Sequence, residues 1–148
     1  SIDGFSYFSK SLKLNGSLSY VKGDENETYG PMPSISPIFG TISGEYTKNK
    51  IKISALYKFS GDKSPKDYSL GGEDGLEETP VITENSNGII YAGTPKWSDF
   101  SIYTNYDISE DVKIRIALTN IFDNHYRTFA SGISAPGRSF QIGLYLKL

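Results

Sequence analysis

The sequence predicts an all-β protein, an antiparallel up-and-down meander of about six strands that forms part of a transmembrane β-barrel. Three observations support this fold class. Apolar and polar residues alternate with a period of two in most segments. Short and long connections between these segments also alternate along the chain, and the aromatic residues gather at one end of the predicted strands.

Length and composition exclude several classes of protein and site. The chain has 148 residues, enough for a single domain with a core, and 15 basic and 17 acidic residues give a net charge of −2. This balance provides no electrostatic attraction for nucleic acid, so no nucleic-acid partner is expected. The absence of cysteine excludes disulfides and thiolate metal sites. No run of 18 apolar residues occurs, but a transmembrane barrel needs only alternation.

The alternation is clearest in residues 112–122, where apolar and polar side chains fall on opposite faces. The apolar face carries Val112, Ile114, Ile116, Leu118 and Phe122. The same pattern predicts strands at 12–20, 51–59, 100–108 and 139–148, and a less regular strand at 39–47 with Ile42 and Tyr46 on the apolar face. Phe5–Ser9 has the pattern of the end of another strand, and no helix of any length is expected. The basic residues expected to point into the barrel lumen are Lys52, Lys58, Lys113, Arg115 and Lys147.

The connections support a membrane barrel over a small soluble domain. Short turns are predicted near 10–11, 47–50 and 109–111, and long links at 23–37, 61–96 and 123–138. A link as long as 61–96 is unusual in a compact domain, whereas outer-membrane barrels have short turns on one side and long loops on the other. Ten residues in a tilted strand also span roughly 25 Å, which matches the apolar band of such barrels.

The aromatic residues give an independent indication. Six of them lie on the apolar faces of their strands, at the ends next to the long links, namely Tyr20, Tyr57, Phe59, Phe100, Phe122 and Phe140. Aromatic rings are favoured at the boundary between lipid and water, so these side chains are predicted to be interface anchors. The competing explanation is that aromatic residues are simply common in strands.

Three segments resemble a known family. Asn120-Ile121-Phe122-Asp123 followed by Tyr126 resembles the segment that closes the next-to-last strand of TonB-dependent outer-membrane receptors. Ala135-Pro136-Gly137-Arg138 resembles the segment that opens their last strand. "PMPSISP", residues 31–37, resembles the proline-rich piece of an upstream loop. The three segments occur in the order found in the family.

The resemblance implies a barrel of twenty-two strands with an N-terminal plug inside it. Residues 1–148 would then form the C-terminal segment of the barrel, with the plug and the earlier strands absent. The C-terminus would face the periplasm, and the barrel-assembly machinery would recognise the final strand. The family usually ends in an aromatic residue, whereas this chain ends in Leu148, which places that recognition signal in question. Six strands alone cannot close a membrane barrel, since roughly eight is the minimum.

The resemblance also implies a function and a location. A protein of this family is a multi-pass barrel in the outer membrane of a Gram-negative bacterium, surrounded by outer-membrane lipid. It is a receptor, not an enzyme, for a scarce nutrient such as a ferric siderophore (iron uptake), haem, cobalamin or a glycan. The TonB complex drives transport through the missing plug. No cofactor is implied, and the three long links would contribute to ligand capture.

Candidate chemistry in the chain is sparse. His125, the only histidine, is expected to be a solvated loop residue, with a loop contact to haem, metal or another ligand as the alternative. A metal site would need about three or four ligands, so none is predicted. The acidic run with Glu73, Asp74, Glu77 and Glu78 lacks the spacing of a calcium loop and is expected to be solvated. No catalytic residues are predicted, because no nucleophile elbow or phosphate loop occurs.

Two other functions remain open at this stage. A small soluble β-barrel or sandwich that binds a hydrophobic ligand would also show alternation, but it would not need aromatic residues at one end of its outward faces. A passive porin-type or adhesin barrel would share the membrane features and lack the plug.

Overall fold

The computed structural model describes residues 1–23, 25–26, 30–86 and 88–147 of the chain. Its strands are β1 (Ile2–Tyr7), β2 (Leu12–Ser19), β3 (Glu25–Asn26), β4 (Gly30–Pro31), β5 (Phe39–Lys48), β6 (Ile51–Ser60), β7 (Val81–Asn85), β8 (Gly88–Tyr91), β9 (Trp97–Asp107), β10 (Val112–Thr119) and β11 (Ser139–Leu146). Two 3-10 turns, Pro65–Asp67 and Leu76–Glu78, lie between β6 and β7. Within the described ranges, no helix has both the length and the apolar character needed to cross a membrane.

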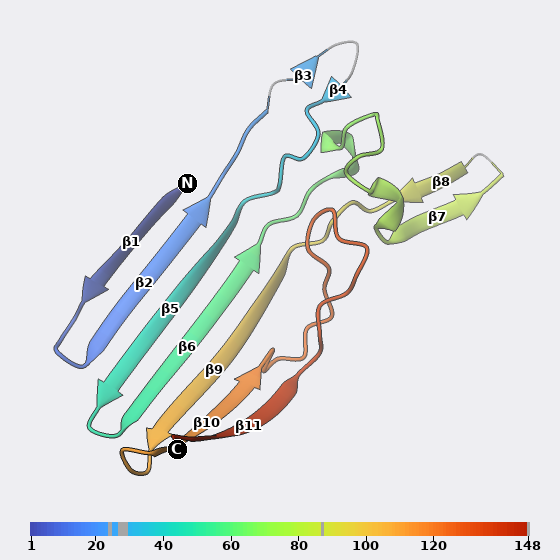
Figure 1. The fold of residues 1–148 in the computed structure, drawn as a ribbon. Coiled ribbons are helices and arrows are strands. Elements are labelled where there is room, and N and C mark those ends of the chain that lie inside the picture. Colours follow the sequence, from blue (N-terminus) through green and yellow to red (C-terminus); the bar gives the residue numbers. More distant parts are fainter. Residues whose placement is uncertain (24, 27–29, 87, 148) are drawn as a thin grey trace.

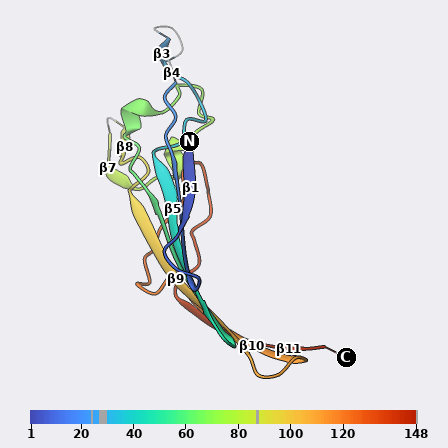
Figure 2. The same cartoon turned by 90° about the vertical axis from the view of Figure 1, so that its left-hand side faces the viewer.

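Seven strands form one antiparallel sheet in the order β1-β2-β5-β6-β9-β10-β11. Figure 1 shows this meander from its blue edge to its red edge, with the long links at one end and the short turns at the other. Seen from the side in Figure 2, the sheet is a single twisted layer, with the links that carry β3–β4 and β7–β8 beyond one end. The all-β antiparallel meander predicted from alternation is confirmed.

The sheet has one strand more than the six that were predicted. β1 pairs with β2 over six residues, from Ile2 opposite Leu18 to Tyr7 opposite Lys13. The full length of β1 was not predicted, because Gly4 and Ser6 occupy positions on the apolar face and interrupt the alternation. The expected strand end at 5–9 was therefore too short and too late, since the strand begins at Ile2 and the chain turns after Tyr7.

Two further strand boundaries differ from the sequence prediction by three residues. The strand predicted over 112–122 ends at Thr119, because Asn120 (φ 47°) and Asp123 (φ 56°) adopt left-handed backbone conformations that a strand cannot contain. β9 starts at Trp97, earlier than the predicted residue 100. Leu148, which alternation assigned to the apolar face of the last strand, lies outside the described residues.

Strand register places most of the apolar side chains on one continuous face, whereas Phe5, Tyr7 and Leu56 lie on the other. Tyr57 of β6 lies opposite Ile42 of β5 and Phe100 of β9, while Ile116 of β10 lies opposite Ile142 of β11. Because side chains alternate across a strand, every second residue from these pairs shares their face. The assignment of Ile42 to the apolar face at 39–47 is therefore correct, and that of Tyr46 is too, since it pairs with Leu12 and Ile53.

The other face is polar, and its charged side chains pair with one another. Its cross-strand contacts are the ion pairs Lys52–Glu45, Lys58–Asp99 (3.1 Å) and Lys113–Asp107 (3.2 Å), and the Arg115 guanidinium 5.8 Å from the Tyr103 ring centroid. Hydroxyl pairs such as Ser17 with Thr41 continue this pattern. The four predicted basic residues within the strands thus lie on the polar face, with Lys147 directly after β11.

Apart from glycine, the buried residues do not lie on the apolar face. They lie on the polar face near the long links or within those links, and comprise Ser60, Lys63, Tyr68, Asp74, Thr94, Asp99, Ser101, Ala117 and Asn120. A single-layer sheet leaves both faces uncovered unless another segment folds over one of them. Here the link between β10 and β11 folds over the polar face at one end, and that end is where a site can form.

Candidate functional site

Three long links meet at one end of the sheet (Figure 1). We call residues 20–38 the first loop, 61–96 the second loop and 120–138 the third loop. The first contains the hairpin β3–β4, and the second contains β7–β8. The sequence analysis missed the β7–β8 hairpin, although two β-branched runs, Val81–Thr83 and Ile89–Ile90, flank a polar turn.

The third loop is closed by the side chain of Asn120. Its Nδ2 donates to the carbonyl oxygens of Asn124 (2.9 Å) and Pro136 (3.0 Å), and its Oδ1 accepts the N–H of Asn124 (3.0 Å). Asn120 is only 2% exposed, so these bonds satisfy a polar group that burial would otherwise penalise. Asparagine also tolerates the left-handed φ at this position.

A second contact joins the two ends of the same loop. Asp123 Oδ1 accepts the backbone N–H of Arg138 at 2.7 Å, and its other oxygen lies 3.7 Å from the Arg138 guanidinium. A Cβ added to Gly137 would lie 3.0 Å from Asp123 Oδ1, so glycine suits this close approach. Ala135 N–H donates to the carbonyl of Tyr126 at 2.8 Å. We call Asn120, Asp123, Pro136 and Arg138 the loop clasp.

The clasp contains residues from both predicted signature segments, which the fold brings into contact across 15 or 16 residues. Ile121 joins through its N–H, which donates to the Phe100 carbonyl at 2.8 Å. Phe122 stacks on Phe100 with ring centroids 6.0 Å apart, on the apolar side of the sheet. From the sequence, residues 120–122 were predicted to end a strand, and the bonds between the two signature segments were not predicted. Their standing as a family signature stays a prediction.

Tyr126 ties the third loop to the polar face of the sheet. Its phenol donates to Asp99 Oδ2 at 2.9 Å, and its ring stacks on Trp97 with centroids 4.3 Å apart. Asp99 also accepts the Ser101 hydroxyl at 2.9 Å and pairs with Lys58. Burial and the adjacent carboxylate raise the pKa of Tyr126 to about 12, so the phenol stays protonated. Sequence analysis did not single out Trp97, whose buried Nε1 has no hydrogen-bond partner among the described residues.

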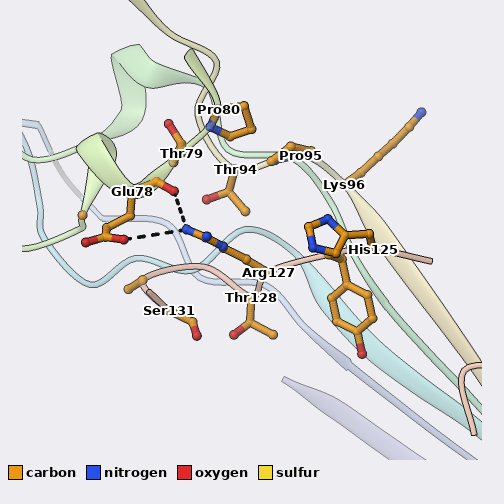
Figure 3. Close-up of a pocket in the computed structure, with 13 residues that line it drawn as sticks. Glu78, Thr79, Pro80, Thr94, Pro95, Lys96, His125, Arg127, Thr128 and Ser131 are labelled. Carbon is orange, nitrogen blue, oxygen red and sulfur yellow. Dashed lines mark hydrogen bonds and ion pairs between the residues drawn. The ribbon is translucent and has the colours of Figure 1, made fainter. Parts of the chain in front are cut away.

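A pocket of about 420 Å³ lies between the second and third loops. Figure 3 shows Arg127 reaching from the third loop to Glu78, where its Nη1 donates to the backbone carbonyl at 3.0 Å and lies 3.7 Å from the carboxylate. Two prolines and three threonines, Pro80, Pro95, Thr79, Thr94 and Thr128, form part of the remaining wall. The charged or titratable side chains at the pocket are Glu78, Lys96, His125, Tyr126 and Arg127.

His125 is exposed and lines this pocket together with residues of the second loop. The structure thus places the histidine where a ligand in the pocket would touch it, and its contact with a ligand stays a prediction. Among the residues that the structure describes, no three histidine, aspartate or glutamate side chains gather as a metal-binding group. The pocket could therefore bind a ligand through its shape and through the charged side chains of Glu78, Lys96 and Arg127.

One expectation about the second loop is wrong. The acidic run was expected to be solvated, but Asp74 is 2% exposed and forms a 3.0 Å ion pair with Lys63, which is 5% exposed. Lys63 lies 11 residues away, and nothing in the local sequence pattern indicates that the two meet. Glu73 is exposed, as expected for a solvated run. The buried charge of Asp74 is compensated by hydrogen bonds from the backbone N–H groups of Ser34 in the first loop and Ser69 in the second.

The predicted interface aromatics lie at the loop end of the apolar face or just beyond it. Tyr57 stacks on Phe59 with centroids 6.0 Å apart. Tyr20, Phe122 and Phe140 are 64%, 66% and 63% exposed, although a protein surface in water rarely presents a contiguous apolar area of this kind. Their role as anchors at a lipid interface stays a prediction.

Comparison with known proteins finds similar folds among solved structures. Neither the protein-family models nor the curated proteins contain a match. Among solved structures, the chain is similar to the copper transporter OprC, with 16% identity and a TM-score of 0.70 over 97% of the chain. It is also similar to PfeA, a ferric enterobactin receptor from Pseudomonas aeruginosa in complex with enterobactin, with 18% identity and a TM-score of 0.68 over 97% of the chain.

The chain has the fold of a segment of these proteins. It spans 22% of the OprC chain and 21% of the PfeA chain, about a fifth of each. At these identities the similarity establishes the fold, which agrees with the resemblance drawn from the signature segments. It does not identify a ligand.

Proposed function

We propose that residues 1–148 form the C-terminal segment of a twenty-two-stranded β-barrel in the outer membrane of a Gram-negative bacterium, in a receptor of the TonB-dependent family. The observation that carries this proposal is the continuous, exposed apolar face of the sheet. On β11, Phe140, Ile142 and Leu144 are 63%, 66% and 60% exposed in succession. Lipid would cover these side chains, whereas water would leave them as an aggregation-prone patch.

The polar face supports the same arrangement. Its ion pairs and hydroxyl pairs suit a wet barrel interior, and the third loop folds toward it through Tyr126 and Asp99. A soluble barrel that binds a hydrophobic ligand would instead turn its apolar face inward. The sheet's outer edges, β1 and β11, are both unpaired among the described residues, and the remaining strands of a larger barrel would pair with them.

The proposed activity is uptake of a scarce nutrient, with energy supplied by the TonB complex through a plug domain outside this chain. The three loops would face the cell surface and capture the ligand, with His125 and Arg127 at the pocket. Copper and ferric enterobactin, the ligands named for the two similar structures, are candidate cargoes, because both proteins share this segment's fold. The barrel-assembly machinery would insert the protein through its final strand.

Cysteine labelling of whole cells tests the membrane arrangement, because the chain has no cysteine of its own. Ile133→Cys lies in the third loop at a site 81% exposed, and Glu110→Cys lies in a short turn at the opposite end. In a full-length protein with every cysteine outside residues 1–148 replaced by serine, a PEG-maleimide too large for porins should label position 133 on intact cells. Position 110 should react only after the outer membrane is disrupted. Equal labelling of both on intact cells would contradict the proposal.

A binding and uptake assay tests the receptor activity. Ferric enterobactin and copper ions would be titrated against the purified full-length protein, and their accumulation measured in cells with and without TonB. Arg127→Ala should weaken ligand binding, because it removes the hydrogen bond to Glu78 that joins the second and third loops. Lys147→Ala, at the other end of the sheet, serves as the matched control. TonB-independent accumulation would favour a passive porin-type barrel.

A further inference from the structure

The buried Lys63 side chain contacts all three loops at once. Its ammonium donates to the carbonyl of Ile35 in the first loop at 2.7 Å and to Asp74 in the second loop at 3.0 Å. It also lies 4.1 Å from the ring centroid of Phe129 in the third loop and 5.0 Å from that of Tyr68. A single cation with partners on three separate segments can hold those segments in register.

The partners of Lys63 are themselves buried and cross-linked. Asp74 Oδ1 accepts the backbone N–H of Ser34 at 2.7 Å, so the carboxylate links the second loop to the first as well. Burial alone would raise the pKa of Asp74, but the hydrogen bonds from Ser34 and Lys63 hold it below its ordinary value. Tyr68, 2% exposed, packs edge-on against Phe129 with centroids 5.9 Å apart.

The cluster is joined to residues that line the pocket. Thr94 lines the pocket and bonds to the Tyr68 hydroxyl at 2.5 Å, and its backbone exchanges two hydrogen bonds with that of Lys63. Phe129 lies between Thr128 and Ala130, which line the opposite wall. Displacement of the ammonium would therefore affect both walls, although Lys63 itself does not line the pocket.

We propose that Lys63 and Asp74 are positioning residues that join the three loops into one unit and set the spacing of the pocket walls. If the two residues stabilised only the second loop, the contact between Lys63 and Asp74 would be sufficient. The additional partners, Ile35, Ser34 and Phe129, lie on the other two loops, so the cluster couples segments that are far apart in the chain. The consequence for ligand binding rests on the proposed receptor function, whereas the coupling of the loops does not.

Hydrogen exchange of backbone amides in the full-length protein tests the coupling without any ligand. Lys63→Met keeps the length of the stem and removes the cation. It should speed exchange about tenfold or more at residues 30–38 and 124–131, on loops other than its own, because losing a buried partner favours local opening. Amides of β6 and β9 should keep their protection, which shows that the sheet has folded. Lys66→Met, at an exposed site three residues away, is the matched control and should change nothing.

A double variant separates coupling from the simple cost of an unpaired charge. Lys63→Met/Asp74→Asn leaves neither buried charge of this ion pair. If an unpaired buried charge were the sole cause of the faster exchange, the double variant should exchange at the wild-type rate. The proposal expects the first and third loops to remain faster, because the contacts with Ile35 and Phe129 are still missing. Faster exchange confined to residues 61–80 in Lys63→Met, or full recovery in the double variant, would overturn it.

Discussion

The Tyr126 hydroxyl donates a 2.9 Å hydrogen bond to Oδ2 of Asp99, and this bond fastens the third loop to the polar face of β9. The two residues are 27 positions apart, and the stacked rings of Tyr126 and Trp97 lie beside the bond. A loop held in this way covers one end of the sheet's polar face, so it would narrow the mouth of a barrel built from these strands.

Tyr126→Phe should destabilise this attachment while leaving the sheet intact. The ring stacking on Trp97 remains, but a bond to a charged acceptor worth about 1.5–3 kcal/mol is lost. Asp99 keeps Lys58 and Ser101 as partners, which limits the penalty. Denaturant unfolding of the full-length protein should show the loss, and Tyr103→Phe, on the same face, is the control. An unchanged free energy of unfolding would show that the bond contributes nothing.

The ionisation of Tyr126 gives a pH prediction. Because the folded-state pKa is about 12 and the ordinary value is 10.0, folding favours the protonated phenol. The stabilisation should be complete below pH 10 and should be lost as the pH rises through 12. The absorbance of tyrosinate, as the difference between wild type and Tyr126→Phe, should therefore show one phenol that titrates near 12. A difference titration centred at 10 would contradict the geometry.

Substitutions at Asn120 should separate its backbone role from its hydrogen bonds. Asn120→Ala loses three side-chain bonds at a buried site and must also adopt a positive φ, so a cost of about 2–4 kcal/mol is expected. Asn120→Gly accepts the backbone conformation and loses only the bonds, so it should be about 1 kcal/mol more stable than the alanine variant. Thermal unfolding measures both. Equal stabilities would show that the left-handed backbone carries no cost.

The two partners of the Asp123–Arg138 contact should not be equivalent. The Arg138 side chain is 56% exposed and 3.7 Å from the carboxylate, so Arg138→Ala should cost less than about 1 kcal/mol. Asp123→Ala loses the 2.7 Å acceptor for the Arg138 backbone N–H and should cost more. Asp123→Asn, which keeps an acceptor oxygen, is the control. The reverse order in unfolding measurements would mean that the guanidinium, not the backbone, holds the clasp.

Neighbouring positions on β11 test which face meets lipid. A tryptophan at Phe140 should be quenched by brominated lipid in reconstituted vesicles, because that side chain is on the apolar face. A tryptophan at Gln141, one residue along and on the opposite face, should be protected. Both signals would be measured as differences from wild type, because Trp97 contributes its own. Equal quenching at both positions would contradict the assignment of the two faces.

The sequence alone determined the antiparallel meander and the two faces of its sheet. Period-two alternation is a local property of each strand. A short turn also fixes the register between the two strands that it connects. The apolar positions from Leu12 to Leu146 could therefore be predicted without knowing any contact. The same logic failed where alternation is interrupted, as at Gly4 and Ser6 of β1.

Only the tertiary structure decided how the loops are held. Asn120 meets Pro136, Tyr126 meets Asp99, and Lys63 meets Ile35 and Phe129 through contacts between residues that are distant in the chain and have no periodicity. Asp74 shows the limit most plainly, since its acidic surroundings predicted solvation and the fold buried it instead. Burial of a charge depends on the partners that the fold supplies, and a local sequence pattern does not contain that information.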